Sequence, residues 1–304
     1  MKIVFAGSPA FAVPALGALL DAGKEVVAVI TQPDKPTGRK KVLTATPVKA
    51  FALERGLRVY EFAKIKEHTD ELKSLGADVM FTCAYGQILT RSVLDVFPLG
   101  VWNIHASLLP KFHGASPVQA AILAGERHTG VTVMRTELSL DTGDMLLVKR
   151  CETGKMTCGE LTEKLSYLGA EAIKEAAYIL ESGNVQTLMQ NETDATYCKK
   201  VEKQDAKLDF SDNAEILARK VRAFSPQPSA YCIQNGVILN ILNAEAAEGN
   251  GVCGEVIAAD KRGITVGCGA GTLLITELQP SGGKHMRAAD YVNGRKIKVG
   301  DKLD

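Results

Sequence analysis

The chain gives its clearest fold signal near its start, in residues 2–31: KIVFAGSPAFAVPALGALLDAGKEVVAVIT. Lys2–Ala6 is a compact apolar run that predicts a buried strand. Pro9–Asp21 carries small and apolar residues at helical spacing, and Glu25–Thr31 is a second run that is rich in valine and isoleucine. A strand, a helix and a strand in this order, with runs that are apolar on both faces, indicate a parallel sheet covered on both sides.

The same alternation continues to about residue 180. We therefore expect an α/β fold with a Rossmann-like, doubly wound, mostly parallel sheet. The further elements that we expect are strands at Arg58–Tyr60, Asp78–Ala84, Val101–His105, Gly130–Met134 and Asp144–Lys149, and helices at Pro47–Arg55, Ile65–Leu75, Val118–Ala124 and Cys158–Ser182.

The pattern changes after Gly183. Residues 184–207 are polar and have no periodic apolar stripe, which predicts a linker. A helix is expected at Asn213–Ala223, and from Ala230 onward short Val/Ile/Leu runs are separated by glycines. Such spacing is typical of a small closed barrel. We expect a catalytic domain at 1–183, a linker at 184–207 and an OB-like β-barrel domain at 208–304.

Composition excludes several classes of protein. The chain has 36 Lys+Arg and 35 Asp+Glu, so it is not uniformly basic, although a local basic patch remains open. Its seven cysteines form no CxxC pair, which argues against a disulfide framework or a zinc site and favours reduced thiols in the cytoplasm. No apolar run reaches the ~20 residues of a membrane span. The apolar start is also too short for a signal peptide, because Gly7, Ser8 and Pro9 break it.

The turn after the first predicted strand is a candidate ligand contact, because open α/β sheets bind ligands at the carboxyl ends of their strands. Here that turn is Ala6-Gly7-Ser8-Pro9, and a plain tight turn is the other interpretation. The fingerprint G-x-G-x-x-G is absent, and the second strand ends in Thr31-Gln32 rather than in an acidic residue. A nicotinamide-dependent oxidoreductase is therefore disfavoured.

The segment 32–48 (QPDKPTGRKKVLTATPV) has four basic residues and one acidic residue. Its three prolines remove backbone donors and its charges oppose burial, so we expect an exposed loop. Such a loop is either an ordinary solvated segment or a contact for nucleic acid. Its expected place on the rim of the ligand crevice favours the second interpretation.

Asn103 and His105 lie two residues apart at the end of a predicted strand, so their side chains share one face. An amide and an imidazole can both donate a hydrogen bond to an oxygen that becomes negative. Asp141, in the turn LDTGD, can approach from a neighbouring strand and would favour the charged imidazole. A satisfied polar pair at a strand end is the alternative interpretation of Asn103 and His105 alone.

Larger motifs surround these residues: NIHASLLPKFHGASPV at 103–118 and LSLDTGDM at 138–145. Together they closely resemble the signature of the folate-dependent formyltransferases. FAGSPAFAVPAL, TQPDKPTGRKK, CAYGQIL and LQPSGGKHM extend the resemblance over essentially the whole chain. The resemblance departs from the family at His113, where an arginine is usual, and at Ser139, where a glycine or alanine is common.

The resemblance implies that a formyl group passes from 10-formyltetrahydrofolate to the free amino group of methionine on initiator tRNA. It assigns catalysis to Asn103, protonated His105 and Asp141, with no metal. It assigns the folate site to Ser107, Leu108, Leu109, Pro110, Ala84, Tyr85, Gly86, Gln87, Ile88 and Leu89. It assigns tRNA contacts to Lys35, Arg39, Lys40 and Lys41. We expect the C-terminal barrel to bind the tRNA as well, by analogy with small barrels that bind oligonucleotides. We expect a cytoplasmic monomer.

Other functions remain open from the sequence. Glycinamide ribonucleotide formyltransferases, sugar-amine formyltransferases and formyltetrahydrofolate hydrolases share this catalytic domain, but the first usually lacks the barrel and the basic loop. A non-catalytic RNA-binding module is the alternative from another class. The intact set of Asn103, His105 and Asp141 argues against that module.

Overall fold

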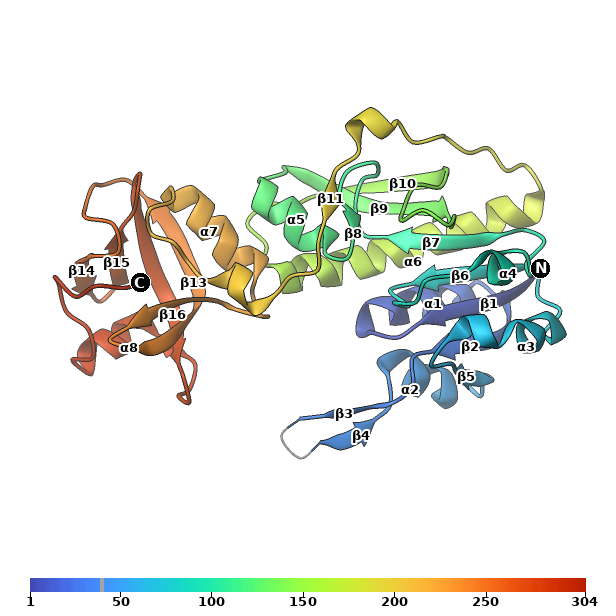
Figure 1. Ribbon diagram of the computed structural model, residues 1–304, viewed down its shortest axis with the longest axis horizontal. Helices are drawn as coiled ribbons and strands as arrows, with labels where there is room; N and C mark the ends of the chain where they lie inside the picture. Colours follow the sequence, from blue (N-terminus) through green and yellow to red (C-terminus); the bar gives the residue numbers. More distant parts are fainter. Residues whose placement is uncertain (39–40) are drawn as a thin grey trace. The chain divides into compact units, whose positions relative to one another are not determined.

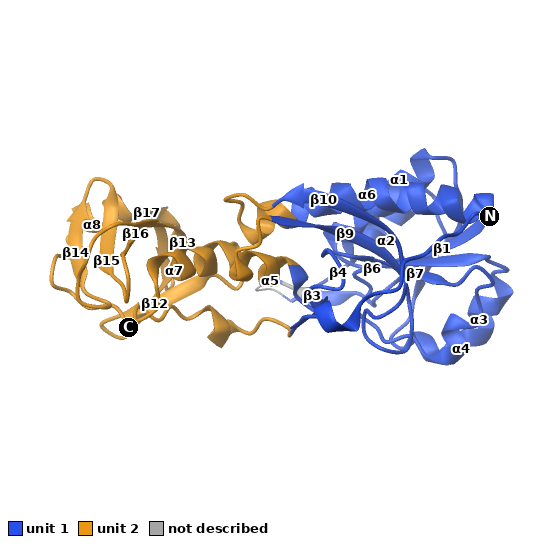
Figure 2. Cartoon of the chain, turned by 90° about the horizontal axis from the view of Figure 1, so that it is seen from above, with its two compact units in different colours: residues 1–117, 128–152, 162–198 blue, residues 118–127, 153–161, 199–304 orange. Residues whose placement is uncertain are grey.

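The computed structural model describes residues 1–38 and 41–304, which form two compact units (Figure 2). The N-terminal unit comprises residues 1–117, 128–152 and 162–198. The C-terminal unit comprises residues 118–127, 153–161 and 199–304. Residues 118–127 and 153–161 thus belong to the C-terminal unit by their contacts, although they precede residue 183. The expected division at residue 183 placed them in the catalytic domain.

The N-terminal unit is built on a seven-stranded sheet with the order β10-β9-β7-β6-β1-β2-β5 (Figure 1). The five strands from β5 to β7 pair in parallel, and β9 and β10 are antiparallel additions. The chain leaves β1 first toward β2 and later toward β6, so the crevice of a doubly wound sheet is expected at the carboxyl ends of these strands. The strands are β1 (Lys2–Gly7), β2 (Glu25–Thr31), β5 (Val59–Glu61), β6 (Val79–Cys83), β7 (Val101–His105), β9 (His128–Arg135) and β10 (Met145–Glu152).

Helices cover both faces of this sheet, as predicted. Figure 2 shows α1 and α6 on one side of the strands and α3 and α4 on the other. The expected helix at Ile65–Leu75 is split into a 3-10 turn, η2, and α3, whereas α6 has the predicted bounds. The helices of this unit are η1 (Ala10–Ala12), α1 (Val13–Asp21), α2 (Pro47–Glu54), η2 (Ile65–Glu67), α3 (Thr69–Ser74), α4 (Arg91–Leu94) and most of α6 (Cys158–Ser182). By its contacts, α5 (Pro117–Ala124) belongs almost entirely to the C-terminal unit.

Alternation along β7 decides where its polar side chains point. Val101 belongs to the core cluster that includes Leu72 of α3 and Val93 of α4. Ile104 instead lies on the α6 side, against Gly169. Because successive side chains of a strand point to opposite faces, Asn103 and His105 lie on the same face as Val101, at the carboxyl end of the strand.

The segment 32–48 forms an antiparallel ribbon rather than an irregular loop. Its strands are β3 (Lys35–Thr37) and β4 (Val42–Thr44), and the side chains of Val42 and Leu43 are exposed. Proline is compatible with β3 because each strand of a two-stranded ribbon has an outer edge that pairs with no further strand. The backbone N–H that proline lacks is not needed at such an edge. Residues 35, 36, 38 and 41–44 are exposed as expected, whereas Val48 at the end of the segment is buried. The expected lack of secondary structure is corrected.

Much of the expected linker at 184–207 is also structured. Leu188 pairs with Met145 through two backbone hydrogen bonds of 2.8 and 2.9 Å. β11 (Tyr197–Cys198) pairs in parallel with β8 (His113–Gly114). The 3-10 turns η3 (Glu192–Asp194) and η4 (Lys203–Ala206) complete the segment. Its polar composition hid these contacts, because they are made by backbone and polar side chains rather than by an apolar stripe.

The C-terminal unit is a small barrel with the strand order β12-β13-β16-β15-β14, and β17 pairs with β16. Residues 300–304 close it: Asp304 exchanges two backbone hydrogen bonds with Ile233 of β12, and Asp301 accepts one from Val256 of β14. This confirms the expected C-terminal β domain. The elements are α7 (Ala214–Ala223), β12 (Ala230–Gln234), β13 (Val237–Ala247), β14 (Val256–Asp260), β15 (Gly263–Gly267), β16 (Thr272–Pro280), β17 (Met286–Arg287) and α8 (Ala288–Asn293).

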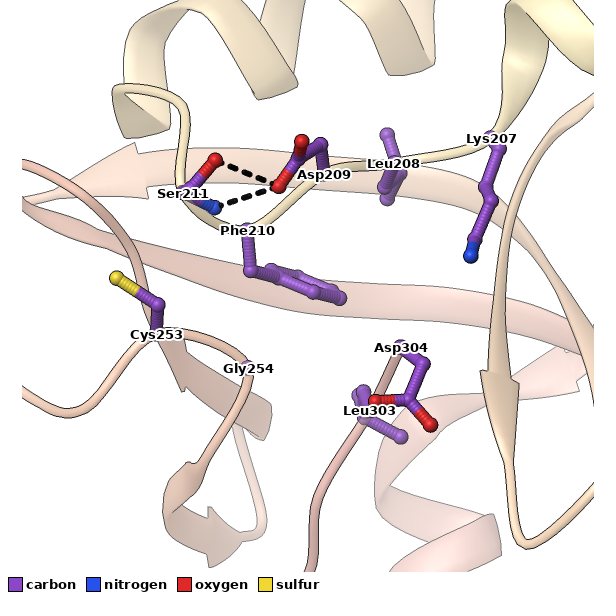
Figure 3. Close-up of a pocket in the computed structure, with 9 residues that line it drawn as sticks. All are labelled: Lys207, Leu208, Asp209, Phe210, Ser211, Cys253, Gly254, Leu303 and Asp304. Atoms are coloured by element: carbon purple, nitrogen blue, oxygen red, sulfur yellow. Dashed lines mark hydrogen bonds between the residues drawn. The ribbon is translucent and has the colours of Figure 1, made fainter.

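A hollow of about 500 Å³ lies beside the closing segment (Figure 3). Asp209 on its wall accepts hydrogen bonds from the hydroxyl and backbone amide of Ser211. Its lining residues, Lys207–Ser211, Cys253, Gly254, Leu303 and Asp304, include none of the candidate catalytic residues. Within the described residues, no helix combines the length and apolar character needed to cross a bilayer.

Candidate active site

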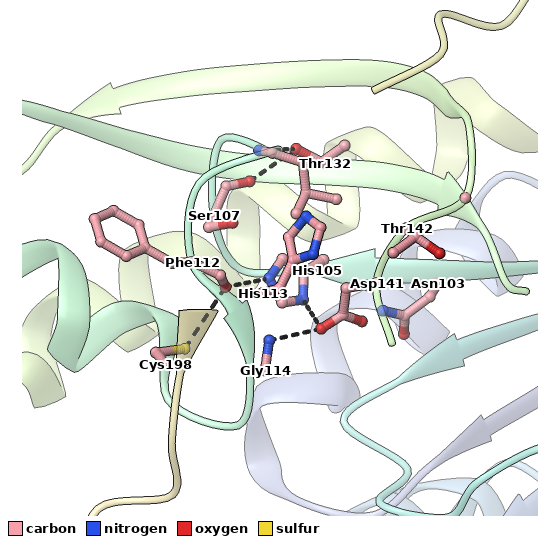
Figure 4. Close-up of polar contacts among 12 residues, drawn as sticks. Asn103, His105, Ser107, Phe112, His113, Gly114, Thr132, Asp141, Thr142 and Cys198 are labelled. Carbon is pink, nitrogen blue, oxygen red and sulfur yellow. Dashed lines mark hydrogen bonds and ion pairs between the residues drawn. The ribbon is translucent and has the colours of Figure 1, made fainter. Parts of the chain in front are cut away.

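The three candidate catalytic groups converge at the carboxyl end of β7. Figure 4 shows Asn103, His105 and Asp141 gathered in one place, although Asp141 comes from the turn between β9 and β10. The Nδ1 atom of His105 lies 3.7 Å from Oδ2 of Asp141. Both side chains are largely buried. The structure therefore brings together an amide, an imidazole and a carboxylate, as the motifs predicted.

The turn that delivers Asp141 depends on tight backbone geometry. Asp141 has a φ of +58°, which is unfavourable for a residue other than glycine. At Gly143 a Cβ would lie 1.9 Å from the carbonyl oxygen of Arg135, so only glycine fits there. Arg135 and Asp144 close the base of the turn with a 2.8 Å backbone hydrogen bond. The motif LDTGD thus encodes a turn that projects its aspartate over the sheet.

The hydrogen bonds of His105 fix which of its nitrogens can titrate. Nε2 lies 2.9 Å from the carbonyl oxygen of Phe112. A carbonyl only accepts, so Nε2 carries a proton in every protonation state. The nitrogen that gains or loses a proton is therefore Nδ1, which faces Asp141.

Burial lowers the pKa of His105 below its ordinary value, and this outweighs the opposing effects of Asp141 and of the Phe112 carbonyl. The nearby His113 acts in the same direction as burial. The imidazole is therefore mainly neutral near pH 7 before substrates bind. Asp141 thus favours the charged imidazole but does not outweigh burial here, and a protonated His105 in the reacting complex stays a prediction.

Asn103 is oriented by a residue that the sequence analysis did not single out. The hydroxyl of Thr82 on β6 donates to Oδ1 of Asn103 at 2.8 Å. With Oδ1 occupied in this way, the Nδ2 amide group is left to donate elsewhere. Thr82 is directly opposite Asn103 in the β6–β7 register, so the pair follows from strand pairing that the sequence alone does not reveal.

Asp141 is held by the turn that follows β7. Its Oδ2 atom accepts a 2.8 Å hydrogen bond from the backbone amide of Gly114. The neighbouring residue Phe112 has a φ of +64° and turns its carbonyl toward His105. Residues 112–114 therefore contact both members of the His105–Asp141 pair.

The segment 107–110 is mostly built into the protein. Ser107 is fully buried, and its hydroxyl donates to the carbonyl of Lys111 at 2.6 Å. Leu109 packs with Met134 and Met145 in a small core cluster. These two side chains shape the turn, while Leu108 and Pro110 are only partly buried. Direct contact of this segment with folate stays a prediction.

The segment 84–89 presents both backbone and an apolar side chain. Ala84 and Gly86 have positive φ values, and Ile88 is 86% exposed. The side chain of Gln87 faces inward, where it accepts from the amide of Ile65 and donates to the carbonyl of Phe62. Tyr85 and Leu89 are buried. The side chain of Ile88 and the backbone near Ala84 and Gly86 are therefore exposed, and contact of residues 84–89 with folate stays a prediction.

The predicted tRNA contacts lie on the β3–β4 ribbon. Lys35 and Lys41 are both exposed. Arg39 and Lys40 fall outside the described residues, so their contact with tRNA stays a prediction. The neighbouring Lys49 is engaged differently, because it forms 2.8 Å ion pairs with Asp34 and Glu61.

Comparison with known proteins identifies the family of this chain. Residues 1–177 match the formyl transferase family, and residues 200–296 match the family described as formyl transferase, C-terminal domain. The first match alone spans more than half of the chain. The chain belongs to the formyl transferase family.

Relatives of this formyl transferase are similar along their whole length. A methionyl-tRNA formyltransferase from Neisseria gonorrhoeae is 44% identical over 308 residues, with all of both chains covered. One from Ruminiclostridium cellulolyticum is 41% identical over 310 residues, covering all of this chain and 99% of that one.

Solved structures support the fold. HypX from Aquifex aeolicus, in complex with tetrahydrofolic acid, matches with a TM-score of 0.65 and 19% identity over 99% of this chain and 50% of its own. WlaRD, a sugar 3N-formyl transferase, matches with a TM-score of 0.68 and 20% identity over 92% and 97%. Identities this low are informative about the fold alone.

Clustered ligand side chains and reactive thiols were also sought in the described part of this formyl transferase. Among residues 1–38 and 41–304, no three His, Cys, Asp or Glu side chains are grouped as a metal site. Cys83 lies next to the predicted folate segment, but burial raises the pKa of its thiol to about 12. A thiol that stays protonated is a poor nucleophile.

Proposed function

We propose that this chain transfers the formyl group of 10-formyltetrahydrofolate to the free amino group of methionyl initiator tRNA. The products are formylmethionyl-tRNA and tetrahydrofolate. One observation carries the proposal: the Asn103, His105 and Asp141 side chains meet in a chain whose full length aligns with methionyl-tRNA formyltransferases. Because this reaction belongs to translation initiation, we place the protein in the cytoplasm. We also propose that it acts as a monomer.

The reaction needs a site that stabilises a developing oxyanion. The neutral amine attacks the formyl carbon, and the formyl oxygen gains negative charge in the tetrahedral intermediate. The Nδ2 group of Asn103 donates one hydrogen bond to this oxygen. Nδ1–H of His105, once protonated, donates a second. A positioned donor of this kind typically contributes on the order of 10²–10³ in rate.

Proton movement fits the neutral resting imidazole. The attacking amine must lose one proton, and the folate nitrogen must gain one before it leaves. Neutral His105 accepts that proton at Nδ1, and the new negative charge on the formyl oxygen favours this because it raises the proton affinity of a buried base. Asp141 stabilises the imidazolium that forms. The proton then passes to the leaving nitrogen, and His105 returns to its neutral state.

Folate is a co-substrate here, and the described residues offer features that suit it. A pterin is flat and carries several hydrogen-bonding groups. The exposed Ile88 offers an apolar contact, and the positive-φ backbone at Ala84 and Gly86 leaves amides and carbonyls near the surface. We propose that the pterin binds at 84–89 beside Leu108 and Pro110, with Ser107, Leu109 and Gln87 supporting the walls.

We propose that the β3–β4 ribbon and the C-terminal barrel bind the tRNA. Lys35 and Lys41, with Arg39 and Lys40 between them, would contact phosphates, which give affinity with little base reading. The exposed Val42 and Leu43 on the same ribbon could pack against the sugar or base of an unpaired nucleotide.

An acceptor competition tests the proposal. Purified protein and 10-formyltetrahydrofolate are incubated with methionyl initiator tRNA, with free methionine or with a nucleotide-linked amino sugar. We expect formylation of the tRNA-bound methionine at a kcat/KM that is orders of magnitude higher than for either alternative. Faster formylation of the amino sugar, or release of formate without transfer, would contradict the proposal.

A further inference from the structure

One segment reaches both halves of the candidate site. Residues 187–198 lie beside the turn that carries Asp141 and beside residues 110–115, which contact His105. Thr187 donates to Asp144 at 3.0 Å, and Leu188 is paired with Met145. From its polar composition, this segment is expected to be a linker.

Gln190 is the centre of these contacts. It is 8% exposed, and its side-chain amide donates to the carbonyl of Asp141 at 2.7 Å and to the carbonyl of Gly143 at 2.8 Å. Both carbonyls belong to the turn in which Asp141 has a positive φ. Such a backbone conformation persists only when its surroundings hold it. The two bonds from one amide supply that restraint.

The amide of Gln190 is itself fixed. Nε2 of His113 lies 3.0 Å from Oε1 of Gln190, and this bond orients the two N–H groups toward the turn. The ring of Tyr197 packs edge-on against His113 with centroids 5.1 Å apart. The orientation therefore depends on residues from two separate segments.

The same segment also restrains the turn beside His105. The Thr196 hydroxyl accepts from the amide of Phe112 at 2.8 Å, and the Thr196 carbonyl accepts from the amide of His113 at 2.8 Å. Cys198 places its carbonyl oxygen so close to Gly114 that a Cβ there would lie 2.2 Å away. Phe112 and Gly114 are the residues whose backbones bond to His105 and Asp141.

We propose that Gln190 is a positioning residue of the active site, which keeps Asp141 within reach of His105. Segment 187–198 is then part of the catalytic unit rather than a connector. Its effect on rate rests on the proposed function, but the position of Asp141 can be tested without any turnover.

The first test removes the donors and keeps the shape. In Gln190→Met, the turn loses both hydrogen bonds, and Asp141 moves away from His105. We expect kcat to fall by about 10- to 100-fold, because misplacing a reacting group by about 1 Å costs up to about 10²-fold. The KM values should change little, since the ground-state contacts of tRNA and folate are elsewhere. Gln186→Met is the matched control: Gln186 is exposed directly before this segment, and the described contacts include no hydrogen bond of its side chain.

The second test uses pH as a switch. In Gln190→Glu, the ionised carboxylate repels both carbonyls, but the protonated carboxyl donates one hydrogen bond. We expect the kcat of Gln190→Glu, relative to that of Gln190→Met, to rise as the pH falls from 8 to 6. The titratable groups around this position are His105, His113, Asp141, Asp144, Glu192, Arg135, Glu137 and Tyr197, and Gln190→Met is the reference because its turn is loosened too but residue 190 itself cannot titrate. A flat ratio between the two variants would overturn the proposal, as would an unchanged kcat in folded Gln190→Met.

The third test follows the imidazole itself. If Asp141 moves away, His105 loses the interaction that raises its pKa, so its NMR titration in Gln190→Met should shift to lower pH than in wild type. This shift is expected even if no formyl transfer is found, so failure of the proposed function and failure of the positioning role give different results. An unshifted titration would contradict the role of Gln190. Should Gln190→Met not fold, Gln190→Glu replaces it in this test. The His105 titration in Gln190→Glu should then lie at lower pH than in wild type, and an unshifted titration would contradict the role of Gln190.

Discussion

At the scale of single residues, the site holds its hydrogen-bond donors ready before any substrate arrives. Thr82 fixes the amide of Asn103, and the Phe112 carbonyl fixes the ring of His105. Donors that need no reorientation in the transition state stabilise charge better than mobile ones. The residues that do the fixing are therefore as open to testing as the donors themselves.

Removing the charge of Asp141 should separate catalysis from folding. Asp141→Asn keeps an oxygen that can accept from Gly114, so the turn should persist. It removes the carboxylate that stabilises the imidazolium, and we expect kcat to fall on the order of 10²–10³-fold with little change in thermal stability. Steady-state kinetics and a thermal melt measure both. Turnover near that of wild type would remove Asp141 from the mechanism.

Removing the hydroxyl of Thr82 should loosen Asn103. Thr82→Val is nearly isosteric but leaves Oδ1 of Asn103 without its donor, so the amide can rotate. One hydrogen bond contributes about 1 kcal/mol, which corresponds to roughly a fivefold loss in kcat. Thr129→Val is a matched control, because Thr129 is a buried strand residue whose hydroxyl has no partner among the described residues. Equal effects of the two substitutions would contradict the role of Thr82.

His105 should titrate below its ordinary pKa of 6.5, because burial disfavours its charged form. NMR of the imidazole, assigned with His105→Gln, measures this. In Asp141→Asn the titration should move lower still, since a group that raises the pKa is lost. The unfolded chain binds this proton more readily than the folded one, so His105 reduces stability as the pH falls through about 6.5 and below. Titration above 6.5 would mean that Asp141 dominates after all.

At the scale of elements, the sequence predicts what depends on local pattern. Cys158–Ser182 is amphipathic and ends before Gly183, and α6 has these bounds. The antiparallel pairing of β9 and β10 was not foreseen, because apolar runs do not state their partners. Gln190 carried no signal at all: a single polar residue in a polar stretch looks exposed until the carbonyls that it contacts are in place. The candidate catalytic set was found through its motifs, and its supporting residues were not.

Closure of the barrel gives a test at the same scale. Leu303 is 4% exposed, and its amide donates to the carbonyl of Gly254 at 2.8 Å. Leu303→Ala should destabilise the C-terminal unit by about 2–5 kcal/mol, as for other buried leucines. Hydrogen exchange should then show reduced protection at Ile233 and Val256, whose amides bond to residues 301–304. Val299→Ala, at a position that is 60% exposed, should leave this protection unchanged. Similar loss in both variants would mean that the segment does not close the barrel.

At the scale of the whole molecule, the charge balance limits how an RNA can be bound. With a formal net charge of +1, the protein as a whole attracts tRNA weakly. Affinity must then come from local clusters such as the β3–β4 ribbon. Binding through local phosphate contacts depends on salt in proportion to the number of contacts, whatever the net charge.

We therefore expect the affinity for methionyl-tRNA to fall steeply with salt, with a slope of log K against log salt on the order of −4 to −6 for about five to seven phosphates. Deacylated tRNA should show the same slope, because the methionine adds no phosphate contact. The double variant Lys35→Gln, Lys41→Gln should weaken binding and reduce the slope by about 1 for each lysine that contacts a phosphate. Lys174→Gln on α6 is the control, since Lys174 is an exposed lysine for which the described residues supply no ion pair. If the ribbon variant kept the wild-type slope and instead lost affinity for folate, the ribbon would belong to the folate site and not to the tRNA interface.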